Sequence, residues 1–183
     1  CRVLRALGQS RGSPRGSYAY IGSEGLSQTI NFSGGGDLTL VGGTSGSRNY
    51  ASVFGNTQTI TGANAITVTG GASGGFATEG NSARIGSFNG GAQTISAGSL
   101  TITGGAAGVE NEAKVTATGA QTLTLGGNLV VQGGGNASNS GSVSATGNQT
   151  ITLNNANLLR VRAGAGAATI KSDGHQIITL QGA

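Results

Sequence analysis

Apolar and polar residues alternate in short runs that recur along the whole chain. The clearest run opens with Gln, followed in most copies by Thr and Ile. Its copies begin at Gln28, Gln58, Gln93, Gln121, Gln149 and Gln176, at intervals of 27 to 35 residues. Such alternation predicts β-strands with one buried face. A repeat of this length is typical of solenoids, in which each repeat forms one turn of a stack.

Each repeat contains two further alternating runs. A second run, such as Leu100-x-Ile102, follows the glutamine run, and a third, such as Ala51-x-Val53, precedes the next Gln. We therefore predict an all-β fold, a parallel β-helix (solenoid) of about six turns with three short strands per turn. Residues 18–183 form this repeat domain, and residues 1–17 form a basic N-terminal arm or cap.

Glycine pairs follow most copies of the second run. They are Gly42-Gly43, Gly70-Gly71, Gly104-Gly105 and Gly133-Gly134. Glycine suits a corner that needs either a positive φ or a close approach of two backbones. The pairs therefore predict corners of the solenoid.

Two sets of amide side chains recur at fixed places in the repeat. The first is the glutamine set, and the second stands two residues before the small residue of the third run. This second set is Asn49, Asn81, Asn111 and Asn139. The alternation places both sets inward or at a corner, where stacked amides donate and accept hydrogen bonds along the axis. We predict structural ladders and not a polar binding groove.

The composition restricts the core and the class of protein. The chain has 183 residues with 37 Gly, 1 Pro and 9% charged residues, and Phe and Tyr are few. A thick core of large side chains is excluded, whereas a thin core of Ala, Val, Ile and Leu is possible. Their regular recurrence distinguishes the chain from a flexible linker. No run approaches the ~20 apolar residues of a membrane-spanning helix.

The net charge of +4 is concentrated at the N-terminus. Arg2, Arg5, Arg11 and Arg15 precede the first acid, and the remaining basic residues balance the six acids. A neutral body with few aromatic residues argues against nucleic acid as a partner. Together with Cys1, these arginines form a candidate assembly arm. Cys1 is an inert thiol, an interchain disulfide partner or a lipidated terminus, and a chain starting there is expected to be a processed or excised piece.

Catalytic chemistry has few candidate residues. His175 is the only histidine, and with Ser172 and Asp173 it is better explained as a turn than as a triad. A polysaccharide lyase would need clustered acids and a basic residue. The best such patch is Glu79, Arg84, Glu112 and Lys114. Exposed ion pairs explain this patch better, and no cluster has metal-ligand spacing. We predict no enzyme activity, cofactor or metal.

Outward threonines form a candidate binding face. Its members are Thr59, Thr61, Thr122, Thr124, Thr150 and Thr152. The face resembles the Thr-x-Thr arrays of β-solenoid ice-binding proteins, which implies ice binding as an alternative function. Asn31, Ser96 and Ile177 interrupt the ranks, and Thr favours any exposed strand.

The Gln-Thr-Ile turn, the Leu129-x-Val131 run, the Gly-Gly corner and the Asn-x-Ala-x-Val run that begins at Asn49 carry a wider resemblance. Residues 18–183 resemble bacterial secreted β-helix proteins of the filamentous-haemagglutinin and autotransporter-passenger type. The resemblance implies a structural or adhesive protein, outside the cell or on its surface, in a filament, an adhesin or a biofilm matrix. Cell-surface glycans are a further candidate partner.

The ends of such a fold predict self-association on independent grounds. A β-helix exposes unpaired backbone groups at both ends, and these invite another strand unless they are capped. We expect residues 2–7 to form a short amphipathic turn over the first end. We also expect the last turn of one subunit to stack head to tail on the next.

Overall fold

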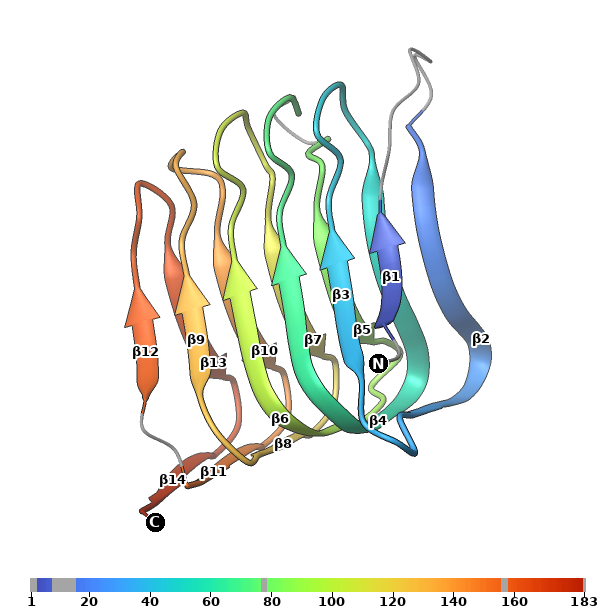
Figure 1. Cartoon of the computed structure of the whole chain (residues 1–183), viewed down its shortest axis with the longest axis vertical. Coiled ribbons are helices and arrows are strands. Elements are labelled where there is room, and N and C mark those ends of the chain that lie inside the picture. Colours follow the sequence, from blue (N-terminus) through green and yellow to red (C-terminus); the bar gives the residue numbers. More distant parts are fainter. Residues whose placement is uncertain (1–2, 8–15, 77–78, 156–157, 183) are drawn as a thin grey trace.

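The computed structural model describes residues 3–7, 16–76, 79–155 and 158–182. Over these residues the chain is all-β, without a helix, and winds as a parallel β-solenoid of about five turns (Figure 1). The strands are β1 (Val3–Leu7), β2 (Tyr18–Asn31), β3 (Asp37–Val41), β4 (Tyr50–Thr69), β5 (Ala83–Ser87), β6 (Gln93–Thr103), β7 (Ala113–Ala117), β8 (Gln121–Leu125), β9 (Leu129–Gln132), β10 (Gly141–Ala145), β11 (Gln149–Asn154), β12 (Leu159–Arg162), β13 (Ala168–Ser172) and β14 (Gln176–Gln181).

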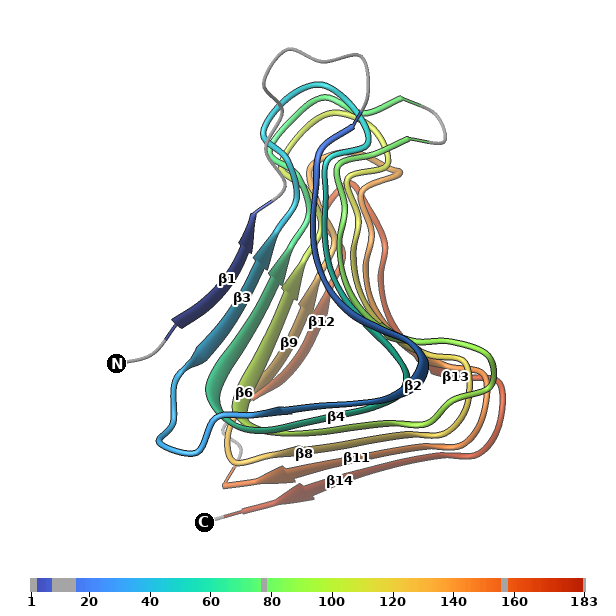
Figure 2. The ribbon, with the colours of Figure 1, turned by 90° about the vertical axis from the view of Figure 1, so that its right-hand side faces the viewer.

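The cross-section is a triangle with loops gathered at one apex (Figure 2). The glutamine face consists of β8, β11, β14 and the segments of β2, β4 and β6 that begin at Gln28, Gln58 and Gln93. The glycine face consists of β1, β3, β9, β12 and the last segments of β4 and β6. The asparagine face consists of β5, β7, β10, β13 and the first segments of β2 and β4.

Equivalent residues stack directly upon one another. Gln28 pairs with Gln58, Gln58 with Gln93, and the series continues to Gln176 with every pairing parallel. The described residues place six strand segments on each face, so six rungs are separated by five steps. This explains the small difference between the six turns expected and the five found.

Residues 3–7 belong to the stack itself. They form β1, which pairs in parallel with β3 along its whole length, from Val3 opposite Asp37 to Leu7 opposite Val41. The expected amphipathic turn over the first end is therefore wrong for these residues, because their backbone completes the glycine face of the first rung. The solenoid begins before residue 18, the boundary that the sequence predicted.

The core consists of columns, each with one kind of side chain. Val53, Ile85, Val115 and Val143 follow one another on the asparagine face and are all 0% exposed. Small residues fill the adjacent column, which includes Ala51, Ala83 and Ala113. Because the strands are ~4.8 Å apart, side chains of similar shape pack evenly along each column. The inward positions of all three faces are the alternating apolar positions of the sequence.

Replacing one inward residue tests this assignment. Ile95 lies in the middle of the glutamine face and is 0% exposed. The substitution Ile95→Ala should lower the free energy of unfolding by about 2–5 kcal/mol, because it leaves a cavity between two neighbouring rungs. Thr94→Ala, at the next and outward position, should cost less than about 1 kcal/mol. Urea unfolding followed by circular dichroism measures both, and equal losses would contradict the alternation.

Candidate functional site

The six glutamines that open the repeats form a continuous hydrogen-bonded ladder. From Gln58 to Gln176, the Nε2 of each glutamine donates to the Oε1 of the glutamine one rung earlier, at distances of 2.5 to 2.8 Å. From Gln28 to Gln149 the side chains are buried, with at most 7% exposed. The ladder lies inside the solenoid at the start of the glutamine face. The buried amides pair with one another through hydrogen bonds, so they are not accessible to a ligand.

The asparagines form a second ladder, with a different hydrogen-bond pattern. The Oδ1 of Asn81 accepts the backbone N–H of Asn49 (3.0 Å), and Asn111 and Asn139 repeat this contact with the preceding asparagine. Their Nδ2 groups donate to loop carbonyls, as Asn49 does to Ser45 (2.7 Å) and Asn111 to Ala107 (2.6 Å). The side chains thus provide the hydrogen bonds that the backbone lacks where the chain leaves the loops.

The glycine pairs lie opposite this ladder and narrow the apex to a neck. The second glycine of each pair donates its N–H to the carbonyl of an asparagine, as Gly71 does to Asn81 at 2.6 Å. Four such bonds, between 2.6 and 3.0 Å, close the loops of successive rungs. None of the eight glycines has a positive φ. A Cβ on Gly71 would instead collide with the side chain of Asn81, so close approach is the reason for glycine here.

The threonines of the glutamine face stand in two columns. One contains Thr29, Thr59, Thr94, Thr122 and Thr150 and ends at Ile177; the other contains Asn31, Thr61, Ser96, Thr124, Thr152 and Thr179. All six predicted members of the threonine array therefore share one face. The register adds Thr29, Thr94 and Thr179, so that Asn31 and Ser96 substitute one polar side chain for another within a column.

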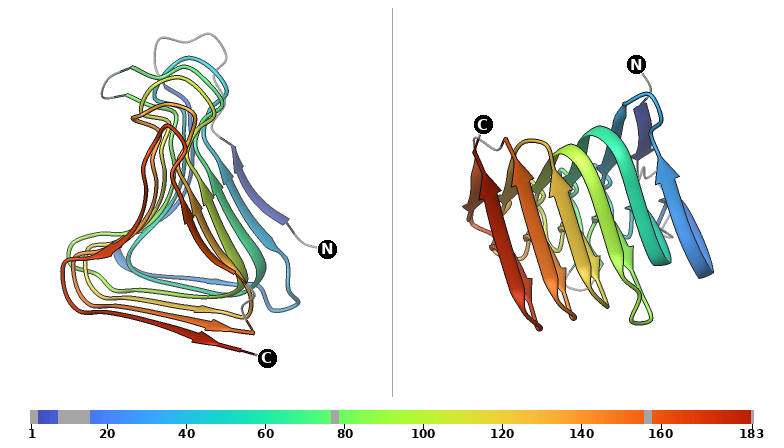
Figure 3. Two further views of the ribbon diagram at one scale, coloured as in Figure 1. Left: turned by 90° about the vertical axis from the view of Figure 1, so that its left-hand side faces the viewer. Right: turned by 90° about the horizontal axis from the view of Figure 1, so that it is seen from below.

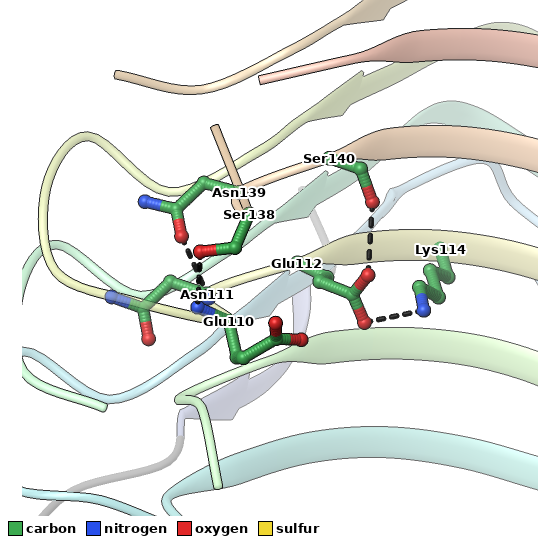
Figure 4. A network of polar contacts seen from close by, with 7 residues as sticks. All are labelled: Glu110, Asn111, Glu112, Lys114, Ser138, Asn139 and Ser140. Carbon is green, nitrogen blue, oxygen red and sulfur yellow. Dashed lines mark hydrogen bonds and ion pairs between the residues drawn. The ribbon is translucent and has the colours of Figure 1, made fainter. Parts of the chain in front are cut away.

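The charged residues of the predicted lyase patch fall into separate contacts. Lys114 forms an ion pair with Glu112, which also accepts a hydrogen bond from Ser140 at 3.0 Å (Figure 4). Glu79 pairs with Arg48 instead. The described residues contain no group of three or more side chains suited to hold a metal ion.

His175 is exposed on the last rung, in the turn between β13 and β14. Its backbone N–H donates to Asn148, and the hydroxyl of Ser172 accepts the N–H of Gly174 at 3.1 Å. These backbone bonds are those of a turn. The hydroxyl of Ser172 donates to the backbone carbonyl of His175 at 3.5 Å. The hydrogen bonds of the described residues include none that joins the side chains of Ser172, Asp173 and His175 to one another.

The last rung differs from the others in exposure. Val161, Ile178 and Leu180 are 47%, 36% and 55% exposed. Their partners one rung earlier, Val131, Ile151 and Leu153, are each 0% exposed. Side chains of the core columns are therefore uncovered at this end of the described solenoid.

The predicted assembly arm is mostly outside the described residues. This applies to Cys1, Arg2, Arg11 and Arg15, whereas Arg5 belongs to β1. Sequence reasoning missed another surface cluster, the aromatic residues Tyr18, Tyr20, Tyr50 and Phe54 on the outer side of the asparagine face. The sequence contained one indication of this cluster: Tyr18 and Tyr50 both directly precede the alanine of the third run, which places them at equivalent positions of neighbouring repeats.

The fold and the ladders define this chain as a parallel β-solenoid with amide-lined corners. No family model, no curated protein and no solved structure matches it. The described part of the chain has no helix of the length and apolar character needed to span a bilayer.

Interrupting the glutamine ladder should destabilise the solenoid strongly. Gln93→Leu leaves the Oε1 of Gln58 without its donor and the Nε2 of Gln121 without its acceptor. Each buried unpaired group costs about 1–3 kcal/mol, so we expect a loss of about 2–6 kcal/mol in the free energy of unfolding. Gln176→Leu is the matched control at the end of the ladder, because it removes only the donor to Gln149.

Chemical denaturation of both variants measures the difference. A clearly larger loss for Gln93→Leu than for Gln176→Leu is the expected result. Similar losses would contradict a continuous ladder in which an internal member has two partners.

Proposed function

We propose that this chain is a structural, adhesive protein of the cell surface or extracellular space that assembles head to tail into filaments. A second copy would occupy the open face of the last rung and continue the three β-sheets. No catalytic step is part of this proposal. The argument rests on the exposure of the last rung, on the direction of the glutamine ladder and on the resemblance to secreted β-helix proteins.

The observation that carries the proposal is the uncovered core at β12 and β14. Val161, Ile178 and Leu180 occupy columns whose members one rung earlier, Val131, Ile151 and Leu153, are fully buried. Burying apolar surface contributes about 25 cal/mol per Å², and an added rung would cover all three side chains at once. It would also pair the free edges of the last strands, which otherwise attract other strands.

The glutamine ladder gives this docking a direction. From Gln58 onward, each Nε2 donates to the Oε1 of the preceding rung. The Oε1 of each glutamine from Gln28 to Gln149 therefore accepts from the rung that follows. The Nε2 of Gln28 donates within its own rung, to the carbonyl of Ile21 at 3.3 Å. In a head-to-tail contact, Gln28 of a second copy could donate to the Oε1 of Gln176 and extend the series. Two last rungs placed face to face would bring acceptor to acceptor. The chemistry therefore favours open polar filaments over closed dimers.

The resemblance and the surface suggest where such filaments act. Residues 18–183 resemble secreted β-helix adhesins in their repeat motifs, and filaments of that kind serve as adhesins or matrix. The four acids and bases discussed above are engaged locally, with Arg48 bound to Glu79 and Lys114 to Glu112. A rod with a largely uncharged surface has little long-range repulsion between copies.

A charge introduced on the open face of the last rung should block assembly. Ile178→Lys places an ammonium group among the apolar columns, where burial without a partner is unfavourable. We expect its self-association to weaken by about tenfold or more. Ile177→Lys is the matched control, since Ile177 precedes Ile178 on the same strand, is 58% exposed and stands on the outer face.

Sedimentation velocity and negative-stain electron microscopy over a wide concentration range provide the measurement, with thermal unfolding as a check on the fold. Parental chain and Ile177→Lys should form rods that lengthen with concentration, and Ile178→Lys should not. A parental chain that remains monomeric at high concentration would refute head-to-tail assembly.

Ice binding is a second candidate, favoured by the register of the threonines. The glutamine face carries hydroxyl-bearing or amide side chains in two columns, and five consecutive rungs have Thr in the first column. Strands about 4.8 Å apart give such an array a fixed repeat along the axis. A rigid array of hydroxyl and methyl groups of this kind is suited to hold water in a regular lattice.

A single bulky residue should distinguish this candidate. If the array binds ice, the parental chain shows thermal hysteresis and Thr122→Tyr abolishes it by interrupting the first column with a bulky ring. Thr101→Tyr, on the glycine face, should leave the hysteresis unchanged. Absence of hysteresis in the parental chain excludes ice binding without affecting the assembly proposal.

A further inference from the structure

The aromatic residues are concentrated on one small part of the surface. The chain has three tyrosines and no tryptophan. All three tyrosines, with Phe54, lie on the outer side of the asparagine face in the first two rungs. Tyr18 and Tyr20 are 77% and 47% exposed. Exposed rings of this size are rarely grouped unless the group contacts something.

These residues line an open hollow on the surface. Tyr18 stands opposite Tyr50, and Tyr20 opposite Ser52, in the parallel pairing of β2 and β4. The hollow between them has a volume of about 400 Å³ and is lined by Tyr18, Ala19, Tyr20, Tyr50, Ser52 and Phe54. This volume is within the range of small-ligand pockets. The pocket opens sideways, on the flank of the rod.

The rings are positioned before any ligand arrives. A Cβ at Gly22 would collide with the ring of Tyr20, and a Cβ at Gly86 would collide with the ring of Phe54, so both glycines leave room for rings that lie over the sheet. The two ring centroids are 6.5 Å apart, with an interplanar angle of 31°. The guanidinium of Arg84 lies 5.4 Å from the Phe54 centroid. Rigid, preplaced rings lose little conformational entropy on binding.

The lining matches the chemistry of a sugar ring. A pyranose has an apolar face of C–H groups and a rim of hydroxyls, so one face packs on an aromatic ring while the rim forms hydrogen bonds. Here tyrosine rings supply the apolar surfaces, and the hydroxyls of Ser52 and the tyrosines supply donors and acceptors. None of the described residues that line the pocket is charged. A nucleic acid would need cations for its phosphates, and the nearby Arg84 lies against Phe54.

We propose that the pocket between Tyr18, Tyr20, Tyr50 and Phe54 binds a neutral pyranose unit of a polysaccharide. This site goes beyond the proposed assembly, because the rings of the pocket lie on the outer side of the first two rungs, whereas the assembly contact is made by the inward columns and strand edges of the end rungs. A rod assembled from such subunits presents one pocket per subunit, so weak binding at each pocket adds up along a polymeric ligand.

Tyrosine fluorescence provides a local readout, because the chain has no tryptophan and all three tyrosines line the pocket. The intact chain is titrated separately with the hexasaccharides of cellulose, starch, chitin, xylan and mannan. A saturable change with at least one of them is expected. Tyr20→Ala and Tyr18→Ala should weaken that binding by about tenfold or more.

Phe76→Ala is the matched control, because Phe76 is another exposed aromatic residue (69%) that lies outside the pocket. It should bind like the parental chain, and circular dichroism should show that all variants are folded. The tyrosine variants should still form rods, which separates failure of this site from failure of assembly.

Three results would overturn the proposal. The first is the absence of a saturable change with every hexasaccharide. The second is binding of single-stranded oligodeoxythymidine in place of the sugars. The third is a fluorescence change that depends on protein concentration without any sugar, which would make the pocket a contact between copies.

Discussion

In-register parallel stacking is the constraint on which the rest of this structure depends. Each strand pairs with its own equivalent one rung away, so every residue meets the same position of the next repeat. A position must then hold a side chain that packs or bonds with copies of itself. Val, Ile and Leu satisfy this by shape, and Gln and Asn satisfy it because an amide is both donor and acceptor. A charged group would meet its own charge and is absent from the described core columns.

The same constraint separates the loops from the rungs. The Asn ladder and the glycine pairs close the necks of four successive rungs, while the loops beyond them, such as residues 44–48 and 135–138, differ in length. Because the neck satisfies the backbone groups at the base of the loop, a longer loop leaves the register of the strands unchanged. The left view of Figure 3 shows rungs of similar triangular outline nested on one another, while their loops diverge at the apex. Variation in sequence and loop length is therefore concentrated at the apex and in the outward columns of such a fold.

The candidate functions lie on three different parts of the rod. The glutamine face is most regular and forms a hydroxyl array, whereas the first two rungs of the asparagine face carry the aromatic residues Tyr18, Tyr20, Tyr50 and Phe54 on their outer side. The last rung interrupts the series in a third way, because its apolar columns have no neighbour on one side. These features lie on the side, flank and end of one rod. In the proposed head-to-tail assembly, both lateral surfaces stay free for contact with other molecules.

The sequence by itself determined the all-β solenoid, the three strands per rung and the two amide ladders, because alternation and a recurring amide are local patterns that the stack preserves. Only the tertiary structure decided that the glycine pairs serve close approach, that β1 belongs to the first rung, and that Glu79 binds Arg48 away from Glu112. It also brought Tyr18 and Tyr50 together across β2 and β4. The physical reason is that side chains that are neighbours on an outer face lie about one repeat apart in the sequence. The lengths of the intervening loops and the directions of the side chains decide which of them touch.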